Sequence, residues 1–490
     1  MEQDYKEKLQ LNQVRQNYGV FGGVSLIFGL ALALSFYKAR IGINVYLFTM
    51  VMIYLLIYIM KRLSIPLKKA TFAYYLGSAL LGVSTMFTAN YALQFLNIIG
   101  IMLLLDLSLV HQFQKDENYD FLNHMGRMFG LLFRSIASLG LPFADSFRFL
   151  KKTRVIKSNK IKNILIGALI ALPILFVIVS LLSSADLLFG EITAKVYQLL
   201  FSPGLFQVTV MVLFGFVICY CILCGAVKYQ TLDAPKARAK EDPMIAITTM
   251  SMITAVYLLF CGIQIMYLFA NGVFVLPQEY TFAEYARRGF FELLAVTIVN
   301  IALIVICTSL FQEHKGLKII LSIMTVCTYI MILSAGYRML LYIEAYHLTF
   351  MRLLVLLFLV IDFFVLAGVI VSVHCRKFSL FGYCVTITAV FYLIFSFSKP
   401  DAFIASYYLN HKKQIDLEDV YFLTGELSYD AAPIVIPYLS DWEKQNDHPN
   451  LTFCKDYVNE LIYEEEKRGV RDINFSYWKA KDIANQFSEK

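Results

Sequence analysis

Four charged side chains interrupt an otherwise apolar part of the sequence and are the first candidates for chemistry. Glu284, Arg288 and Glu292 recur every fourth residue in the stretch YTFAEYARRGFFELL, and Arg287 lies beside them. Because positions i and i+4 are neighbours on one face of a helix, this spacing predicts a ladder of alternating charge. A charge in the middle of a membrane costs about 2.5–3.5 kcal/mol unless it is paired or hydrated. The ladder therefore predicts either a ligand-binding site or a set of structural ion pairs.

A second polar cluster lies in the stretch GYRMLLYIEAYHLTFMR. Arg338, Tyr342 and Arg352 belong to a series with a spacing of three to four residues, which predicts one shared helix face. Glu344 and His347 lie beside that series. Such groups can bind a polar ligand or act as acid and base, and they are also typical of side chains that anchor a helix at the membrane surface.

A third cluster, SSADLLFGE, contains Asp186 and Glu191 directly after an apolar run. Ser183, Ser184 and Asp186 are residue types that cap the start of a helix, so we expect a short amphipathic helix to follow. The choice between a binding site and an interfacial anchor is open here too.

Asp362 differs from these clusters because it lies near the centre of the apolar run LLVLLFLVIDFFVLAGVIV, with no charged neighbour on its own helix. An acid inside the membrane indicates a proton relay or an ion ligand, or else a protonated or hydrogen-bonded structural carboxyl. Asp106 lies near the end of another apolar run, so its side chain reaches the membrane interface more easily than that of Asp362.

The elements that must position these residues are apolar segments of membrane-spanning length. The chain has 490 residues, 59% hydrophobic and 16% charged, whereas soluble proteins carry about 25% charged residues. A helix needs about 20 apolar residues to cross a bilayer. We therefore predict an all-α polytopic membrane bundle of about eleven spans, at 19–36, 41–60, 70–87, 89–110, 161–182, 205–227, 245–270, 290–311, 317–336, 350–373 and 379–398.

Lys and Arg are unequally distributed between the loops that alternate along the chain. The five loops on the side of the N-terminus carry four, nine, four, two and two basic residues, and the other five carry two, none, one, two and one. Because cytoplasmic loops are enriched in Lys and Arg, this predicts a cytoplasmic N-terminus. An odd number of spans then places the C-terminal region outside the cytoplasm, on the same side as the three polar clusters.

Three regions are expected: a cytosolic lead at 1–18, the transmembrane domain at 19–398, and a small helical extracytoplasmic domain at 399–490. Residues 1–398 carry 32 basic and 19 acidic side chains, whereas 399–490 carry 11 and 17, a net charge of −6. This acidic tail argues against nucleic acid as a partner. Within the cytosolic segment 111–160, NHMGRMFGLLFRSIASLG predicts a basic amphipathic helix, either on the inner leaflet or packed under the bundle.

No catalytic motif is present: the sequence lacks a Walker loop, GxSxG, HExxH and a Rossmann glycine pattern. Cys219, Cys221 and Cys224 have a metal-like spacing, but they lie in an apolar segment where Cys behaves as a small hydrophobic residue. We therefore expect no metal, no cofactor and no catalytic residue, and we favour a protein that is not an enzyme without excluding one.

Several stretches, beginning with LLSSADLLF, EYARRGFFELLAVTIVN and YRMLLYIEAYHLTFMR and continuing with KPDAFIASYYLN and LSYDAAP, resemble an uncharacterised bacterial membrane family. That family is known as domain of unknown function 4153, with 4173-type relatives, and the resemblance runs from about the third span to Pro433. It implies a multi-pass protein of the bacterial plasma (inner) membrane. Some members carry labels that suggest association with two-component sensors. The resemblance supplies no catalytic residues.

Three functions remain open on the sequence. The first is an envelope sensor or accessory subunit with an extracytoplasmic polar site and a separate sensor kinase or transporter subunit as partner. The second is a gradient-driven secondary transporter that uses Asp362. The third is a membrane-embedded enzyme acting on a lipid-linked envelope substrate, with Glu292, Asp186 or His347 as acid or base. Membrane lipids are expected partners in each case, and the ligand, a small molecule or a lipid, is not specified.

Overall fold

The computed structural model describes residues 14–113, 121–152, 159–200, 203–230, 240–269, 290–375, 377–412, 415–446 and 453–488. Helices make up the secondary structure of this part of the chain, apart from one isolated β-bridge between Glu241 and Phe311. The helices up to residue 397 are α2 (Tyr18–Phe36), α3 (Ile43–Arg62), α4 (Lys69–Met86), α5 (Tyr91–Phe113), α6 (Phe121–Ile136), α7 (Leu141–Lys152), α8 (Asn159–Ala185), α9 (Leu187–Leu200), α10 (Pro203–Gln230), α11 (Pro243–Phe269), α13 (Phe290–Leu310), α14 (Lys315–Tyr346), α15 (Phe350–His374) and α16 (Leu380–Phe397).

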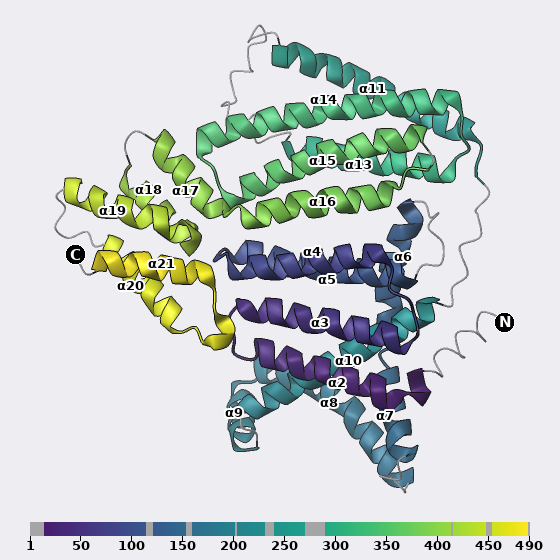
Figure 1. The fold of residues 1–490 in the computed structure, drawn as a ribbon, viewed down its shortest axis with the longest axis vertical. Coiled ribbons are helices and arrows are strands. Elements are labelled where there is room, and N and C mark those ends of the chain that lie inside the picture. The colour runs from purple at the N-terminus through teal and green to yellow at the C-terminus, as the bar shows by residue number, and fades with distance from the viewer. Residues whose placement is uncertain are drawn as a thin grey trace.

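The predicted all-α membrane bundle is confirmed. Ten described helices are long and apolar enough to cross a membrane, or eleven if the bent pair α6 and α7 counts as one span. The predicted third span corresponds to α4, which is not among the ten because it is rich in hydroxyl side chains. Thr71, Ser78, Ser84 and Thr85 of α4 are nevertheless buried, and the Ser84 hydroxyl lies 2.5 Å from that of Ser396 in α16. Neighbouring helices thus shield the polar face of α4, which runs beside α5 (Figure 1).

Helix α14 is longer than the predicted span 317–336. It continues to Tyr346, and Met339 and Ile343 in the added turns are buried. Its apolar stripe continues with no proline to interrupt it, so the helix extends ten residues beyond the predicted end of the span.

Helices α2 and α10 approach each other closely through glycine. A Cβ atom on Gly29 would lie 2.2 Å from the carbonyl oxygen of Val212, and one on Gly215 would lie 2.7 Å from the Cα atom of Gly29. Small residues allow membrane helices to pack backbone against backbone, since van der Waals contact replaces the hydrophobic effect in lipid.

Helix α6 confirms the amphipathic helix predicted within 111–160. Its Leu131 and Ser135 are buried, whereas Phe129, Phe133 and Ile136 are exposed. The axis of α6 runs across the right-hand ends of α4 and α5 rather than along them (Figure 1). An exposed apolar face at the end of a bundle is typical of a helix in the membrane interface, and that location stays a prediction.

The C-terminal helices pack together at the other end of the bundle, to the left of α3, α4, α5 and α16 (Figure 1). We call this end the docking end and the opposite end, which contains α6, the far end. The C-terminal elements are α17 (Pro400–His411), α18 (Leu417–Tyr421), the π-helical turn η1 (Phe422–Glu426), the 3₁₀ turn η2 (Tyr429–Ala431), α19 (Ala432–Asn446), α20 (Phe453–Glu466), the 3₁₀ turn η3 (Val470–Asp472) and α21 (Phe475–Ser488).

One hydrophobic core connects these C-terminal helices to the bundle. Buried residues such as Leu359 and Leu366 of α15 belong to the same contact cluster as Ile404 of α17, Val435 of α19 and Leu461 of α20. The C-terminal helices therefore share one apolar cluster with α13, α14 and α15, and α17 packs directly on α15.

Candidate functional site at the docking end

Two buried carboxylates hold the C-terminal helices on the loop between α4 and α5. The first is Asp430 in η2, which is 2% exposed. Its Oδ2 atom accepts hydrogen bonds from the Thr88 hydroxyl (2.6 Å) and the Ala89 amide (3.1 Å), and Oδ1 accepts from the Ser476 hydroxyl. Burial raises the pKa of Asp430, and the hydrogen bonds from Ser476, Thr88 and Ala89 offset part of that rise.

The second carboxylate is Asp401, in the first turn of α17 and also 2% exposed. Its Oδ2 atom accepts from the Asn90 side-chain amide at 2.8 Å and from the Ser428 backbone amide at 3.1 Å. Asn474 adds a third contact, since its side-chain amide donates to the carbonyl oxygens of Thr85 and Thr88. We call the side chains of Thr88, Asn90, Asp401, Asp430, Asn474 and Ser476 the docking cluster.

Charged side chains extend these contacts toward the loop between α2 and α3. Arg40 forms an ion pair with Glu464 of α20 at 2.5 Å, and the hydrogen bond from Arg40 lowers the pKa of Glu464. The guanidinium groups of Arg468 and Arg471 donate to the carbonyl oxygens of Ile41 and Leu34. The C-terminal segment is therefore attached to two separate loops of the bundle.

A cleft of about 510 Å³ opens between the bundle and the C-terminal helices. Carboxylates (Asp401, Glu426 and Glu460) and hydroxyl groups dominate its polar lining, and none of the described residues that line it is Lys, Arg or His. The described residues that line it are Ala89, Asn90, Tyr91, Ala92, Thr349, Phe350, Met351, Asp401, Phe422, Thr424, Gly425, Glu426, Leu427, Ser428, Tyr429, Glu460 and Tyr477. Such a lining suits a cationic or polyhydroxylated small molecule and disfavours an anion.

The predicted charge ladder lies mostly outside the described residues, because Glu284, Arg287 and Arg288 fall between 269 and 290. Glu292 is exposed in the first turn of α13. The pairing that the spacing predicts therefore stays a prediction.

The second predicted cluster is divided between two helices. Arg338 is buried in α14, with its guanidinium 3.4 Å from the side-chain oxygen of Gln264. The chain turns after Tyr346, so Arg352 belongs to α15 and not to the same helix face as Arg338, which corrects the predicted shared face. Arg352 still lies 4.3 Å from the ring centre of Tyr342.

The turn between α14 and α15 has its own structure. His347 adopts φ of 71°, the left-handed region, and its ring packs edge-on against Tyr408 of α17 at 4.9 Å. Arg352 donates to the carbonyl oxygens of Tyr346 and His347, which satisfies the C-terminal end of α14. Glu344 is exposed. These side chains shape the turn and the contact with α17.

Asp186 confirms the predicted helix cap, since its Oδ1 atom accepts from the Phe189 amide at 2.7 Å at the start of α9. Asp186 is exposed, and α9 lies at the lower edge of the molecule, far from α14 and α17 (Figure 1). The structure therefore does not bring the Asp186 cluster to the same place as the turn between α14 and α15.

Spacing analysis missed the docking cluster. The bonds that connect this cluster to the loop between α4 and α5 join residues separated by 311 to 389 positions, as in the pairs Asn90–Asp401 and Thr85–Asn474. Helical or strand periodicity along the sequence gives no information about contacts at such separations. The available signal was the pair of stretches KPDAFIASYYLN and LSYDAAP, which contain Asp401 and Asp430.

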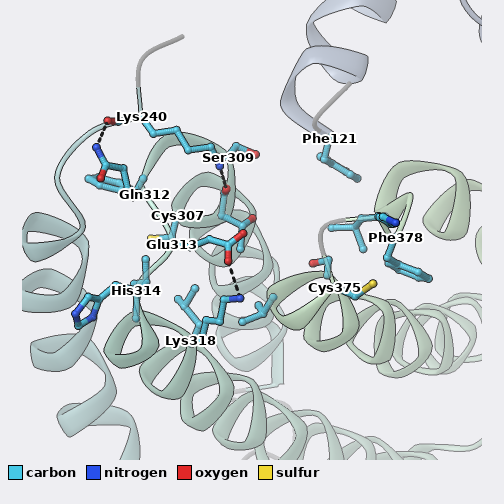
Figure 2. Close-up of a pocket in the computed structure, with 18 of the residues that line it drawn as sticks. Phe121, Lys240, Cys307, Ser309, Gln312, Glu313, His314, Lys318, Cys375 and Phe378 are labelled. Atoms are coloured by element: carbon cyan, nitrogen blue, oxygen red, sulfur yellow. Dashed lines mark hydrogen bonds and ion pairs between the residues drawn. The ribbon is translucent and has the colours of Figure 1, made fainter. Parts of the chain in front are cut away.

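A second cavity, of about 400 Å³, lies at the far end. Figure 2 shows it between two segments, one with Lys240 before α11 and one with Gln312 and Glu313 between α13 and α14, and Cys375 directly after α15. Lys240 donates to the Thr308 carbonyl at 3.0 Å, and Lys318 pairs with Glu313 at 2.9 Å. Because Lys240 lies next to the β-bridge of Glu241, the bridge fixes one wall of this cavity.

The bundle and its attached C-terminal helices define a multi-pass helical membrane protein. The family model described as "Domain of unknown function (DUF4153)" matches residues 75–438, most of the chain, so the protein belongs to this family. The matched region includes Asp401 and Asp430 and ends within α19. No curated protein and no solved structure matches the chain.

Proposed function

We propose that the protein is an envelope sensor or accessory subunit of the bacterial plasma membrane that binds a small molecule in the cleft at the docking end. In this proposal the N-terminus is cytoplasmic and the C-terminal helices are extracytoplasmic, as the distribution of Lys and Arg favours. The cleft is the observation that supports the proposal, because residues of the bundle and of the C-terminal helices line it together. A ligand that contacts both can change how they pack.

The route from the cleft to the far end follows α15. Phe350 and Met351 at its start line the cleft, and Val373 near its end lines the far-end cavity. A helix of 25 residues is about 37 Å long, so it reaches from one face of a membrane to the other. A separate sensor kinase or transporter subunit would then bind at the far end and respond to its change in structure.

A spin label at the far end tests whether the cleft is coupled to it. Cys375 is exposed, and the other cysteines are buried except the half-buried Cys384, so a C384S background allows selective labelling of Cys375. Gly425→Trp would fill the cleft, because a Cβ atom at Gly425 meets nothing within 4 Å. We expect this variant to change the mobility of the label in lipid nanodiscs.

Gly469→Trp is the matched control. Gly469 also lies among the C-terminal helices with nothing within 4 Å of a Cβ atom, and it does not line the cleft. This variant should leave the spectrum unchanged. Spectra that respond equally to both substitutions, or to neither, would contradict coupling between the cleft and the far end.

The other two functions have unequal support. Transport requires an exchangeable group inside the bundle, and the buried Asp362 favours it as the second candidate. The enzyme hypothesis needs an acid and a base together, whereas Asp186 lies far from the turn that carries His347. We therefore do not propose an enzyme.

A further inference from the structure

Asp362 occupies the middle of the route between the two cavities. It is the central residue of the 25-residue helix α15, about 18 Å from either end at 1.5 Å per residue. Its side chain is buried, with 5% exposure, and its Oδ2 atom has no hydrogen-bond partner. No Lys, Arg or His in the described part of the chain forms an ion pair with it. An unpaired carboxylate at this depth is costly.

Polar side chains of α13 and α14 surround this position. Thr297 of α13 interacts with the Asp362 carboxyl. Asn300 lies one turn further along α13, on the same face, and is fully buried. Its amide donates to the Thr328 hydroxyl of α14 at 3.0 Å, whereas its Oδ1 atom has no partner. Three helices thus contribute oxygen atoms to one buried cluster.

The hydroxyl donors of this cluster are shared with backbone carbonyl oxygens. The Thr297 hydroxyl lies 2.9 Å from the Leu294 carbonyl, and the Thr328 hydroxyl donates to the Met324 carbonyl at 2.8 Å. The amide of Asn300 also faces the sulfur atom of Met331 at 4.0 Å. Two acceptors, Oδ2 of Asp362 and Oδ1 of Asn300, remain without a donor. The cluster lacks positive charge.

The other ionisable neighbours do not supply that charge. On α14 the phenol of Tyr329 interacts with Asp362, and Tyr329 interacts in turn with Tyr383 of α16. Both phenols donate to carbonyl oxygens of α15, those of Phe363 and Phe364. Their hydrogen bonds therefore point away from the carboxylate.

We propose that Asp362 is the centre of an intramembrane site that takes up one positive charge, as a proton or as Na⁺. A proton on Oδ2 would give the cluster the donor that it lacks. Alternatively, Na⁺ is a hard cation that oxygen ligands suit, and one carboxylate balances one charge. Other residues line the cleft at the docking end, so the charge-binding site at Asp362 does not depend on the proposed sensor function.

Infrared difference spectroscopy of the full chain in lipid tests the site. The film is stepped from pH 9 to pH 5.5 in choline buffer without Na⁺, and the carbonyl stretch of a protonated carboxylic acid is recorded. We expect the acid step to produce a band that Asp362→Asn removes. Asp106, another acid within the predicted spans, provides the control, because Asp106→Asn should retain the part of the band that Asp362→Asn removes.

Addition of Na⁺ at pH 5.5 then distinguishes the two sources of charge. If the site accepts Na⁺, the band decreases with Na⁺ and not with choline, and if it accepts only protons, the band follows pH alone. Identical difference spectra of the wild type and Asp362→Asn would overturn the proposal. They would mean that the carboxyl keeps one protonation state throughout and serves a structural role.

Discussion

Removal of the Asp430 carboxylate should weaken the attachment of the C-terminal helices to the bundle. The Asp430→Ala variant leaves three donors without an acceptor: the Thr88 hydroxyl, the Ala89 amide and the Ser476 hydroxyl. A buried donor left unsatisfied costs about 1–3 kcal/mol. Because the three donors share one site, their costs are not additive, and we expect about 3 kcal/mol in total. That corresponds to a rise of about 100-fold in the detached population.

Hydrogen exchange followed by mass spectrometry measures this detachment. The backbone amides of α21 should exchange about 100-fold faster in Asp430→Ala, provided that exchange follows the opening equilibrium. Both tryptophans of the chain, Trp442 and Trp478, lie in C-terminal helices, so their fluorescence reports the same event independently.

Two further variants define the result that would refute this reasoning. Asp430→Asn should cost less, because its carbonyl oxygen can still accept from Thr88 and Ala89 while its amide donates to Ser476. Asp441→Ala on α19 should have no effect, because that side chain is 74% exposed and its ion pair with Lys444 measures 4.0 Å. If Asp430→Ala exchanges like Asp441→Ala, the docking cluster does not hold the C-terminal helices.

Two other predictions concern orientation and pH. In intact cells a membrane-impermeant maleimide should react with the Val470→Cys variant, since Val470 is 84% exposed at the docking end. It should react with Cys375 only after lysis. The reverse pattern would place the docking end in the cytoplasm. Burial would raise the pKa of Asp419, but hydrogen bonds from Lys412 and Tyr408 hold it below its usual value. The ionised Asp419 therefore stabilises the fold above about pH 4, and this stabilisation is lost as the pH falls through the lowered pKa. The indole of Trp442 donates to the Ile415 carbonyl, four residues before Asp419. Acid should therefore shift the fluorescence of Trp442, and Asp419→Asn should abolish that shift. If the variant shows the same acid transition, other carboxyl groups cause it.

Sequence reasoning recovered the features that depend on local periodicity. The spans followed from apolar length, the amphipathic α6 from its spacing, and the cap of α9 from Asp186. The same reasoning ended this span at residue 336, ten residues before the end of α14, because the polar stretch with Arg338 interrupts the apolar run, although the apolar stripe of the helix continues.

The candidate sites required information that one sequence does not contain. The docking cluster joins the loop between α4 and α5 to residues more than 300 positions later. Asp362 was recognisable as unusual from its apolar surroundings. Its partners Thr297, Asn300 and Thr328 look like ordinary polar residues until α13 and α14 are placed beside α15.

The docking cluster also determines the order in which the chain can complete its structure during synthesis. Thr88 and Asp430 are separated by 342 residues, which a ribosome adds in about 20–70 s at 5–20 residues per second. For that interval the loop between α4 and α5 has no acceptor for its hydroxyl and amide groups except water. The C-terminal helices that close the docking end are therefore made after the bundle, and synthesis interrupted before α17 would leave the apolar surface of α15 that packs on it uncovered.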